Sequence, residues 1–166
     1  GGEPDAVVSS AGPPRPAFDG AWDVRLLAPA AVGIAADVAL SPDASRVAVA
    51  GQDGVVRLVE AGGEVSALAG HAARVLRVSF APDGGLLASA SADGTVRLWH
   101  LADARLLKTC EGHRGWVQAV AFVGTGDQAL STGADGRLLR WDLQSAEVIA
   151  EMNHGGWAYG LACSPD

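Results

Sequence analysis

The sequence predicts an all-β fold made of repeated four-stranded antiparallel units, and three observations carry this prediction. Asp-Gly dipeptides begin at Asp53, Asp93 and Asp135, 40 and 42 residues apart. Between them, short runs rich in Val, Leu, Ala and Ser alternate in polarity, which is typical of strands joined by hairpins. No window of the chain has the periodicity of an amphipathic helix.

The repeat fixes the positions of the expected strands. The segments LSPDASRVAVAGQDGVVRLVE, FAPDGGLLASASADGTVRLWH and FVGTGDQALSTGADGRLLRWD align without a gap. In the second copy, strands are expected at about residues 75–80, 86–91, 95–100 and 105–110. The same four-stranded meander is expected over residues 34–68 and 117–151. A repeat of this period determines the architecture of the whole domain.

Two kinds of dipeptide recur in register with the turns. One kind precedes the first strand of a unit: Gly70-His71, Gly112-His113 and the weaker Asn153-His154. The other kind ends the third strand: Trp99-His100 and Trp141-Asp142. In these features the chain resembles the WD-repeat β-propeller family. The resemblance implies a propeller of four-stranded antiparallel blades.

Counting strands on this pattern predicts an incomplete ring. Residues 1–20 are rich in Gly, Pro and Ala and predict a flexible linker, and residues 21–166 a partial propeller. The propeller divides into an outer strand at 21–30, blades at 31–69, 70–111 and 112–152, and the first strand of a further blade at 153–166. Propellers usually have four to eight blades. We therefore expect the remaining blades to come from a missing part of the chain, or identical copies to associate.

For the residues near each turn, the resemblance implies two structural hydrogen-bonded tetrads. Their members are His71, Ser89, Asp93 and Trp99 in the second repeat, and His113, Ser131, Asp135 and Trp141 in the third. Ser, His and Asp are also the parts of a hydrolase triad, but a triad needs an exposed serine beside an oxyanion hole, and one copy suffices. Duplication at the repeat period favours a structural role.

The first repeat departs from this pattern. Ala31, Val49 and Val59 occupy the positions of the histidine, serine and tryptophan, and only Asp53 remains. We expect this blade to rely on apolar packing.

The resemblance also implies binding of a protein or peptide on the rim that carries the loops before each first strand. The candidate partner-binding residues are Arg74, Leu76, Trp116, Gln118, Trp157, Tyr159 and Gln52. Trp and Tyr, with Arg, are the residue types enriched at interface hot spots. The competing interpretation is that Trp116 and Trp157 pack between blades and that Arg74 is an ordinary solvated charge.

Composition disfavours several other classes of protein. The formal net charge is −7 and the twelve basic residues are scattered, which argues against nucleic acid and an anionic membrane as partners. The two cysteines make neither a disulfide framework nor a zinc-binding pattern, so we expect no metal or cofactor. We also expect a reduced, cytoplasmic environment. The run GTGDQA at residues 124–129 imitates a dinucleotide-binding loop, but no helix follows it.

These observations predict a non-catalytic scaffold for protein–protein interaction. The alternative is a regulatory or sensor module tethered to an enzyme domain, such as a signalling kinase, encoded outside this chain. A third hypothesis is hydrolysis by Ser89 or Ser131, for which the repeated tetrad offers little support.

Overall fold

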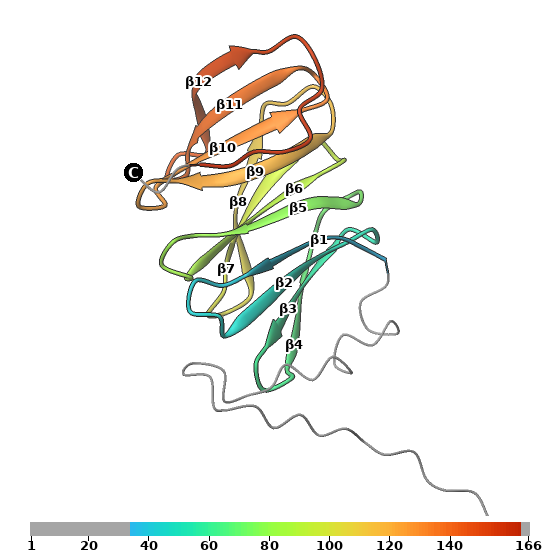
Figure 1. Cartoon of the computed structure of the whole chain (residues 1–166), viewed down its shortest axis with the longest axis vertical. Helices are drawn as coiled ribbons and strands as arrows, with labels where there is room; N and C mark the ends of the chain where they lie inside the picture. The colour runs from blue at the N-terminus through green and yellow to red at the C-terminus, as the bar shows by residue number, and fades with distance from the viewer. Residues whose placement is uncertain (1–33, 164–166) are drawn as a thin grey trace, which may run out of the picture.

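The computed structural model describes residues 34–163, which form three four-stranded antiparallel sheets, or blades (Figure 1). The first contains β1 (Ala35–Leu40), β2 (Arg46–Gly51), β3 (Val55–Glu60) and β4 (Val65–Ala69). The second contains β5 (Val75–Phe80), β6 (Leu86–Ser91), β7 (Thr95–His100) and β8 (Arg105–Glu111). The third contains β9 (Val117–Val123), β10 (Gln128–Gly133), β11 (Arg137–Asp142) and β12 (Glu147–Asn153).

Each blade is a meander in which neighbouring strands in the chain are also neighbours in the sheet. The turn between the second and third strands is the same in all three. Gly54, Gly94 and Gly136 have φ values of 83°, 87° and 75°, a region that favours glycine. The aspartate before each glycine accepts a hydrogen bond from the backbone N–H of the residue after it. The Asp-Gly dipeptides therefore mark turns with a specific chemistry.

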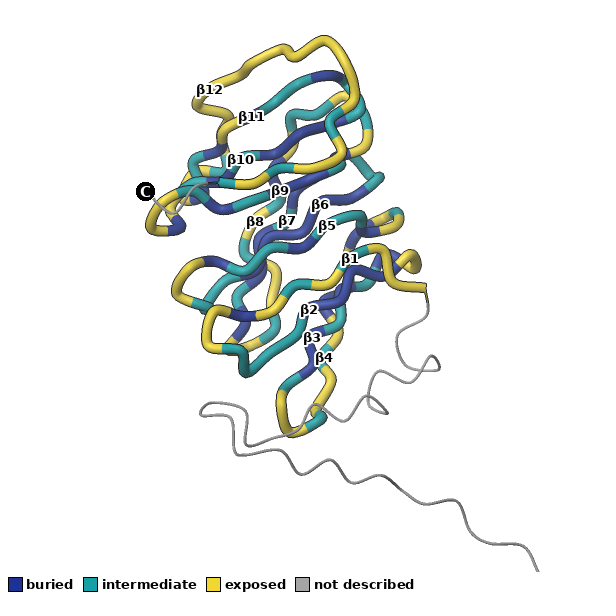
Figure 2. The backbone as a smooth tube through the Cα atoms, in the orientation of Figure 1, coloured by how far each residue is buried: buried dark blue, intermediate teal, exposed yellow. Residues whose placement is uncertain are grey.

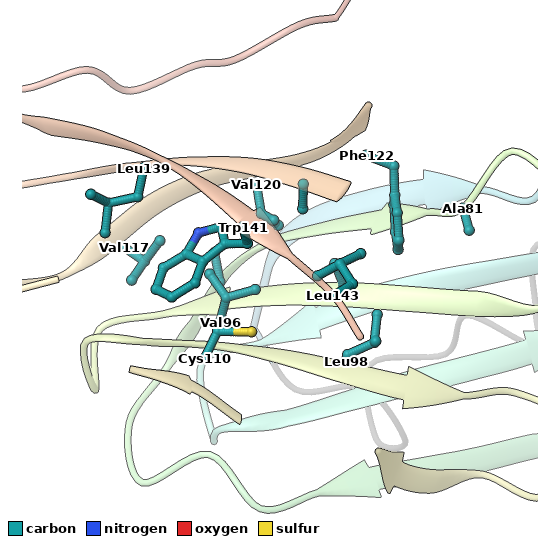
Figure 3. Close-up of a cluster of buried hydrophobic side chains, with 13 residues drawn as sticks. Ala81, Val96, Leu98, Cys110, Val117, Val120, Phe122, Leu139, Trp141 and Leu143 are labelled. Carbon is teal, nitrogen blue, oxygen red and sulfur yellow. The ribbon is translucent and has the colours of Figure 1, made fainter. Parts of the chain in front are cut away.

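The apolar core lies between successive blades. One cluster joins Leu58 and Leu68 of the first blade to Leu87 and Trp99 of the second. The other joins the second and third blades, and Figure 3 shows Trp141 among its side chains, with Val96 and Cys110 close by. The second blade is covered on both faces, because Leu98 on β7 belongs to one cluster and Trp99, the next residue, to the other.

The outer surfaces of the first and third blades carry exposed apolar side chains. On β1 these are Val38 and Leu40, and every residue of β12 is exposed along its length (Figure 2). The expected linker at residues 1–20 and outer strand at 21–30 lie outside the described residues, as does Ala31.

The segment after β12 differs from expectation. Residues 154–163 form no strand, although the first strand of a further blade was expected within 153–166. A strand needs a partner for its backbone hydrogen bonds. Within the described part of the chain this segment has no second strand of its own blade to pair with. Its recorded bonds are isolated ones, such as Thr132 Oγ1 to the Ala158 carbonyl at 3.2 Å.

Candidate functional site

The first polar cluster lies in the second blade, where four elements bring His71, Ser89, Asp93 and Trp99 together. His71 Nδ1 lies 2.7 Å from Asp93 Oδ2, and His71 Nε2 lies 2.8 Å from Ser89 Oγ. The Trp99 indole N–H donates to the same Oγ at 2.8 Å. A carboxylate only accepts, so Nδ1 carries the proton and Nε2 accepts from the Ser89 hydroxyl. In this series of hydrogen bonds from the Asp93 carboxylate to the Trp99 indole, every polar side-chain atom then has a partner.

The third blade repeats this arrangement with His113, Ser131, Asp135 and Trp141. His113 Nε2 lies 2.8 Å from Ser131 Oγ, to which the Trp141 indole donates at 2.7 Å. His113 Nδ1 is shared between the two Asp135 oxygens at 3.0 and 3.1 Å. Arg137 is added here: it forms an ion pair with Asp135 at 3.7 Å and binds Glu151 of β12. This arginine therefore ties the outer strand to the tetrad.

The histidines of both tetrads are held neutral. Burial lowers the pKa of His71 and of His113 below the ordinary value, although the neighbouring Asp93 and Asp135 act in the opposite direction. The pKa of Asp93 is lowered to about 2; burial opposes this shift, and hydrogen bonds from Thr95 and His71 outweigh it. Each pair is thus an ionised carboxylate accepting from a neutral imidazole.

The same order of groups would serve a serine hydrolase, but the setting does not. Ser89 and Ser131 are each 0% exposed, and the oxygen that would attack a substrate already accepts an indole N–H. A nucleophile must reach a substrate carbonyl beside donors for the oxyanion. Neither hydroxyl is open to solvent, so the geometry is that of a buried structural hydrogen-bond network.

The first blade uses a different pair in place of the tetrad. Val49 and Val59 are buried where the other blades have serine and tryptophan. Asp53, which has no histidine partner among the described residues, binds Arg57 of β3 through two bonds of 3.1 and 2.6 Å. Apolar packing is therefore supplemented by an ion pair that the sequence reasoning missed. The signal was available, because Arg57 follows Asp53 by four residues on the strand after the turn.

The end of the blades that carries the loops before β5 and β9 and the Asp-Gly turns is here called the rim face. Arg74 and Trp116 meet on it: the Arg74 guanidinium carbon lies 4.4 Å from the Trp116 ring centroid. Arg74 is exposed and Trp116 is 43% exposed. The two residues hold equivalent places in successive blades, and their carbonyls accept from the backbone N–H groups of the neighbouring turns.

Leu76 and Gln118, two further candidates, both lie in β-bulges. The ladder between β5 and β6 passes from Val75 to Arg77, and that between β9 and β10 passes from Val117 to Ala119. Each bulge leaves one residue without an opposite partner, which can turn its side chain toward the end of the sheet. Both side chains are half-buried. Gln52 is exposed in the turn of the first blade.

Trp157 and Tyr159 lie together beside the third blade. Their rings are 6.0 Å apart in a T-shaped arrangement, and each residue is 61% exposed. A hollow between the β10–β11 turn and this segment is lined by Ala134 and Trp157. The Ala134 N–H donates to the Trp116 carbonyl at 2.8 Å, so the turn that contains Ala134 lies between Trp116 and Trp157 on the rim face.

An ion pair on the inner strands was not predicted. Arg77 on β5 binds Asp37 on β1 at 3.2 Å and donates to the Tyr159 carbonyl at 3.3 Å. It therefore joins the first strands of the first two blades to the segment that follows β12. The pattern could not reveal it, since Asp37, Arg77 and Ala119 occupy equivalent positions without sharing a residue type.

Two other findings bear on the kind of site present. No cluster of three or more His, Cys, Asp or Glu side chains able to hold a metal ion occurs among residues 34–163. Over the same residues, no helix has the length and apolar character needed to cross a membrane.

Comparison with known proteins agrees with this architecture. The family model "WD domain, G-beta repeat" matches residues 62–100 and 104–142. An uncharacterized WD repeat-containing protein of Synechocystis sp. is 37% identical over 76 residues, covering 45% of this chain and 22% of the relative.

Two solved structures share the fold, each with a TM-score of 0.67. "Structure of U3-55K" is 23% identical and covers 72% of this chain; "Crystal structure of RRP9 WD40 repeats" is 24% identical and covers 74%. The chain spans 39% of the length of each. The repeat matches and the three blades show that the chain contains WD40 repeats and has the fold of part of a β-propeller.

Proposed function

We propose that this protein is a non-catalytic scaffold that binds a protein or peptide partner on its rim face. WD40 domains generally serve as scaffolds for protein interaction. The observation that carries the proposal is the contrast between tryptophans. Trp99 and Trp141 are 1% and 0% exposed, whereas Trp116 and Trp157 are 43% and 61% exposed on the rim face. Exposed aromatic residues grouped on one surface are typical of interaction sites.

The remaining rim residues support a continuous surface. Arg74 stacks on Trp116, Tyr159 packs against Trp157, and the bulged Leu76 and Gln118 stand at the starts of the inner strands. Stacking holds these large side chains in place, which lowers the entropy lost when a partner binds. The cytoplasmic setting inferred from the cysteines stays a prediction.

The test compares partner recovery by the wild-type protein and by a variant carrying Trp116→Ala and Trp157→Ala. Proteins retained from a lysate of the source organism are identified by mass spectrometry. We expect specific partners to be lost with the variant, because truncating a central aromatic residue often costs 2 kcal/mol or more, which is about thirtyfold in affinity.

The matched control is Leu106→Ala, which removes a 39% exposed apolar side chain from the outer strand β8. It should retain the same partners as the wild type. Unchanged recovery by the double tryptophan variant, with its fold intact by circular dichroism, would place the binding surface elsewhere.

A further inference from the structure

The rim face carries two exposed arginines, although the whole chain has a net charge of −7. Arg74 and Arg114 are both exposed, in the loops before β5 and β9. Neither forms an ion pair with a carboxylate among residues 34–163, in contrast to Arg57, Arg77 and Arg137.

The carboxylates around this face are mostly engaged by other groups. Asp37 binds Arg77, Asp53 binds Arg57, Asp93 binds His71, Asp135 binds His113 and Glu151 binds Arg137. Glu111 at the end of β8 forms no ion pair with any residue in 34–163. Asp93 and Asp135 keep their negative charge, because their histidines are neutral, but their side chains are only 9% and 6% exposed and offer a ligand little carboxylate surface. Like charges across an interface would oppose binding, so the engaged carboxylates matter as much as the open arginines.

Arg74 is arranged to accept a carboxylate. Its guanidinium carbon lies 4.4 Å from the Trp116 ring centroid. The guanidinium lies over the ring and has no carboxylate partner among residues 34–163, so its N–H groups are able to form two parallel bonds to one carboxylate of a ligand. The ring also restricts the rotamers of Arg74, so less freedom is lost on binding.

Apolar surface adjoins this cation. Trp116 presents the part of its ring that Arg74 does not cover, and the exposed pair Trp157 and Tyr159 follows beyond the Ala134 turn. Arg114 stands in the loop between these features and is fixed there, because its backbone N–H donates to Asp135 at 2.9 Å. A ligand that spans the face would therefore contact both cations and aromatic rings.

We infer that the partner of the rim face is an acidic peptide segment in which carboxylate side chains bind Arg74 and Arg114 while apolar side chains pack on Trp116 and Trp157. This inference rests on the proposed function and adds the chemistry of the partner. The net negative charge of the protein would weaken binding at long range, but an interaction of this kind depends on the local charges at contact, which salt screens.

The probe is a random peptide library displayed on phage and selected against the immobilised wild-type protein. Parallel selections use Arg74→Gln, the double variant Trp116→Ala with Trp157→Ala, and the control Lys108→Gln. Lys108 is exposed on β8 and, like Arg74, forms no ion pair within the described part of the chain. Affinities of enriched peptides, and of versions with Glu and Asp changed to Gln and Asn, are then measured at low and high salt.

We expect peptides that are lost with the tryptophan variant to be acidic and to weaken about tenfold when their carboxylates become amides. Arg74→Gln should cause a loss of similar size, and Lys108→Gln should cause little. Tryptophan-dependent peptides that are neutral or basic, or that keep their affinity as amides, would overturn the acidic preference and leave the proposed function standing. Failure to enrich any tryptophan-dependent peptide would count against both.

Discussion

The serine of each tetrad receives two interactions on one oxygen, and this makes it the residue on which the cluster depends. Ser131 Oγ lies 2.8 Å from His113 Nε2 and accepts the Trp141 indole N–H at 2.7 Å, with no exposure to solvent. Unmet buried polar groups are costly, because they lose water without gaining a partner. The hydroxyl thus links an imidazole and an indole that would otherwise be left unpaired.

Ser131→Ala should lower the free energy of unfolding by about 1–3 kcal/mol, since it leaves an indole donor and an imidazole acceptor buried without partners. Urea denaturation followed by tryptophan fluorescence measures the change. Ser79→Ala is the control, because Ser79 lies on β5 with no side-chain hydrogen bond among the described residues, and it should change stability by less than about 0.5 kcal/mol. Equal effects of the two substitutions would contradict the structural role.

The buried serines also predict an absence of esterase-like reactivity. Wild-type protein should remain unlabelled by a fluorophosphonate probe, because Ser89 and Ser131 are 0% exposed. Intact-mass spectrometry after incubation detects the adduct. Labelling in the folded protein that disappears in Ser89→Ala or Ser131→Ala would revive the hydrolase hypothesis.

The buried histidines predict a loss of stability in mild acid. Each has a pKa below the ordinary 6.5, so between that value and its folded pKa the unfolded chain binds more protons than the folded one. The contribution of the two histidines to the free energy of unfolding is therefore complete above about pH 7, and it decreases as the pH drops below about 6.5. For Asp93, lowered from 3.8 to about 2, stability falls further as the pH passes through that lower range.

Urea midpoints measured from about pH 8 to pH 4 test this dependence. His113→Gln should be less stable at neutral pH and should lose less on acidification, because one of the two buried imidazoles has gone. Midpoints that do not change between about pH 7.5 and pH 5 would contradict neutral, buried histidines.

At the scale of the strands and loops, the glycine before each tetrad histidine allows the loop to cross the tryptophan ring. A Cβ at Gly112 would lie 2.9 Å from Trp141 Cη2 and 3.2 Å from Val148 Cγ2. The Trp141 ring is fully buried and its nitrogen is bound to Ser131, so it has little room to move. Gly112 is therefore required by close packing.

Gly112→Ala should destabilise the protein by about 1–3 kcal/mol, the usual cost of overpacking a filled core. Gly115→Ala is the matched control in the same loop, since its Cβ would lie no closer than 3.6 Å to any other atom. Thermal unfolding of both variants measures the difference. A Gly112→Ala protein as stable as the Gly115→Ala protein would mean that the ring shifts freely.

The strands could be predicted from the sequence because their ends are marked. Strands were expected at residues 75–80, 86–91 and 95–100, and β5, β6 and β7 have these bounds. The Asp-Gly turns fix those ends chemically, and the polarity of the intervening residues fixes their faces.

The features that were missed depend on geometry between strands. The bulges that hold Leu76 and Gln118 arise from strand pairing, and the Asp37–Arg77 ion pair arises from the approach of two blades. The further strand expected within 153–166 is not formed over residues 154–163, where the described part of the chain offers no neighbouring strand of the same blade to pair with it. The tetrad residues could be named in advance because the resemblance to the WD-repeat family implies them, whereas the Arg74–Trp116 contact could not, since it joins different residue types in adjacent loops.

At the scale of the whole molecule, stability comes from interfaces between blades, as in other repeat proteins whose units contact only their neighbours. Two apolar clusters hold three blades, and the second blade contributes to both. Loss of one interface should therefore loosen the two blades that share it and leave the other interface in place.

Leu139→Ala tests this coupling. Leu139 is 0% exposed in the cluster between the second and third blades, so its truncation should cost about 2–5 kcal/mol. Hydrogen exchange followed by mass spectrometry should show faster exchange in β5–β8 and β9–β12, with little change in β1–β4, because the cluster around Leu87 and Trp99 stays filled. Ile149→Ala, on the exposed strand β12 of the same blade, should leave exchange almost unchanged. Faster exchange spread evenly over all three blades would show instead that the molecule unfolds as a single cooperative unit.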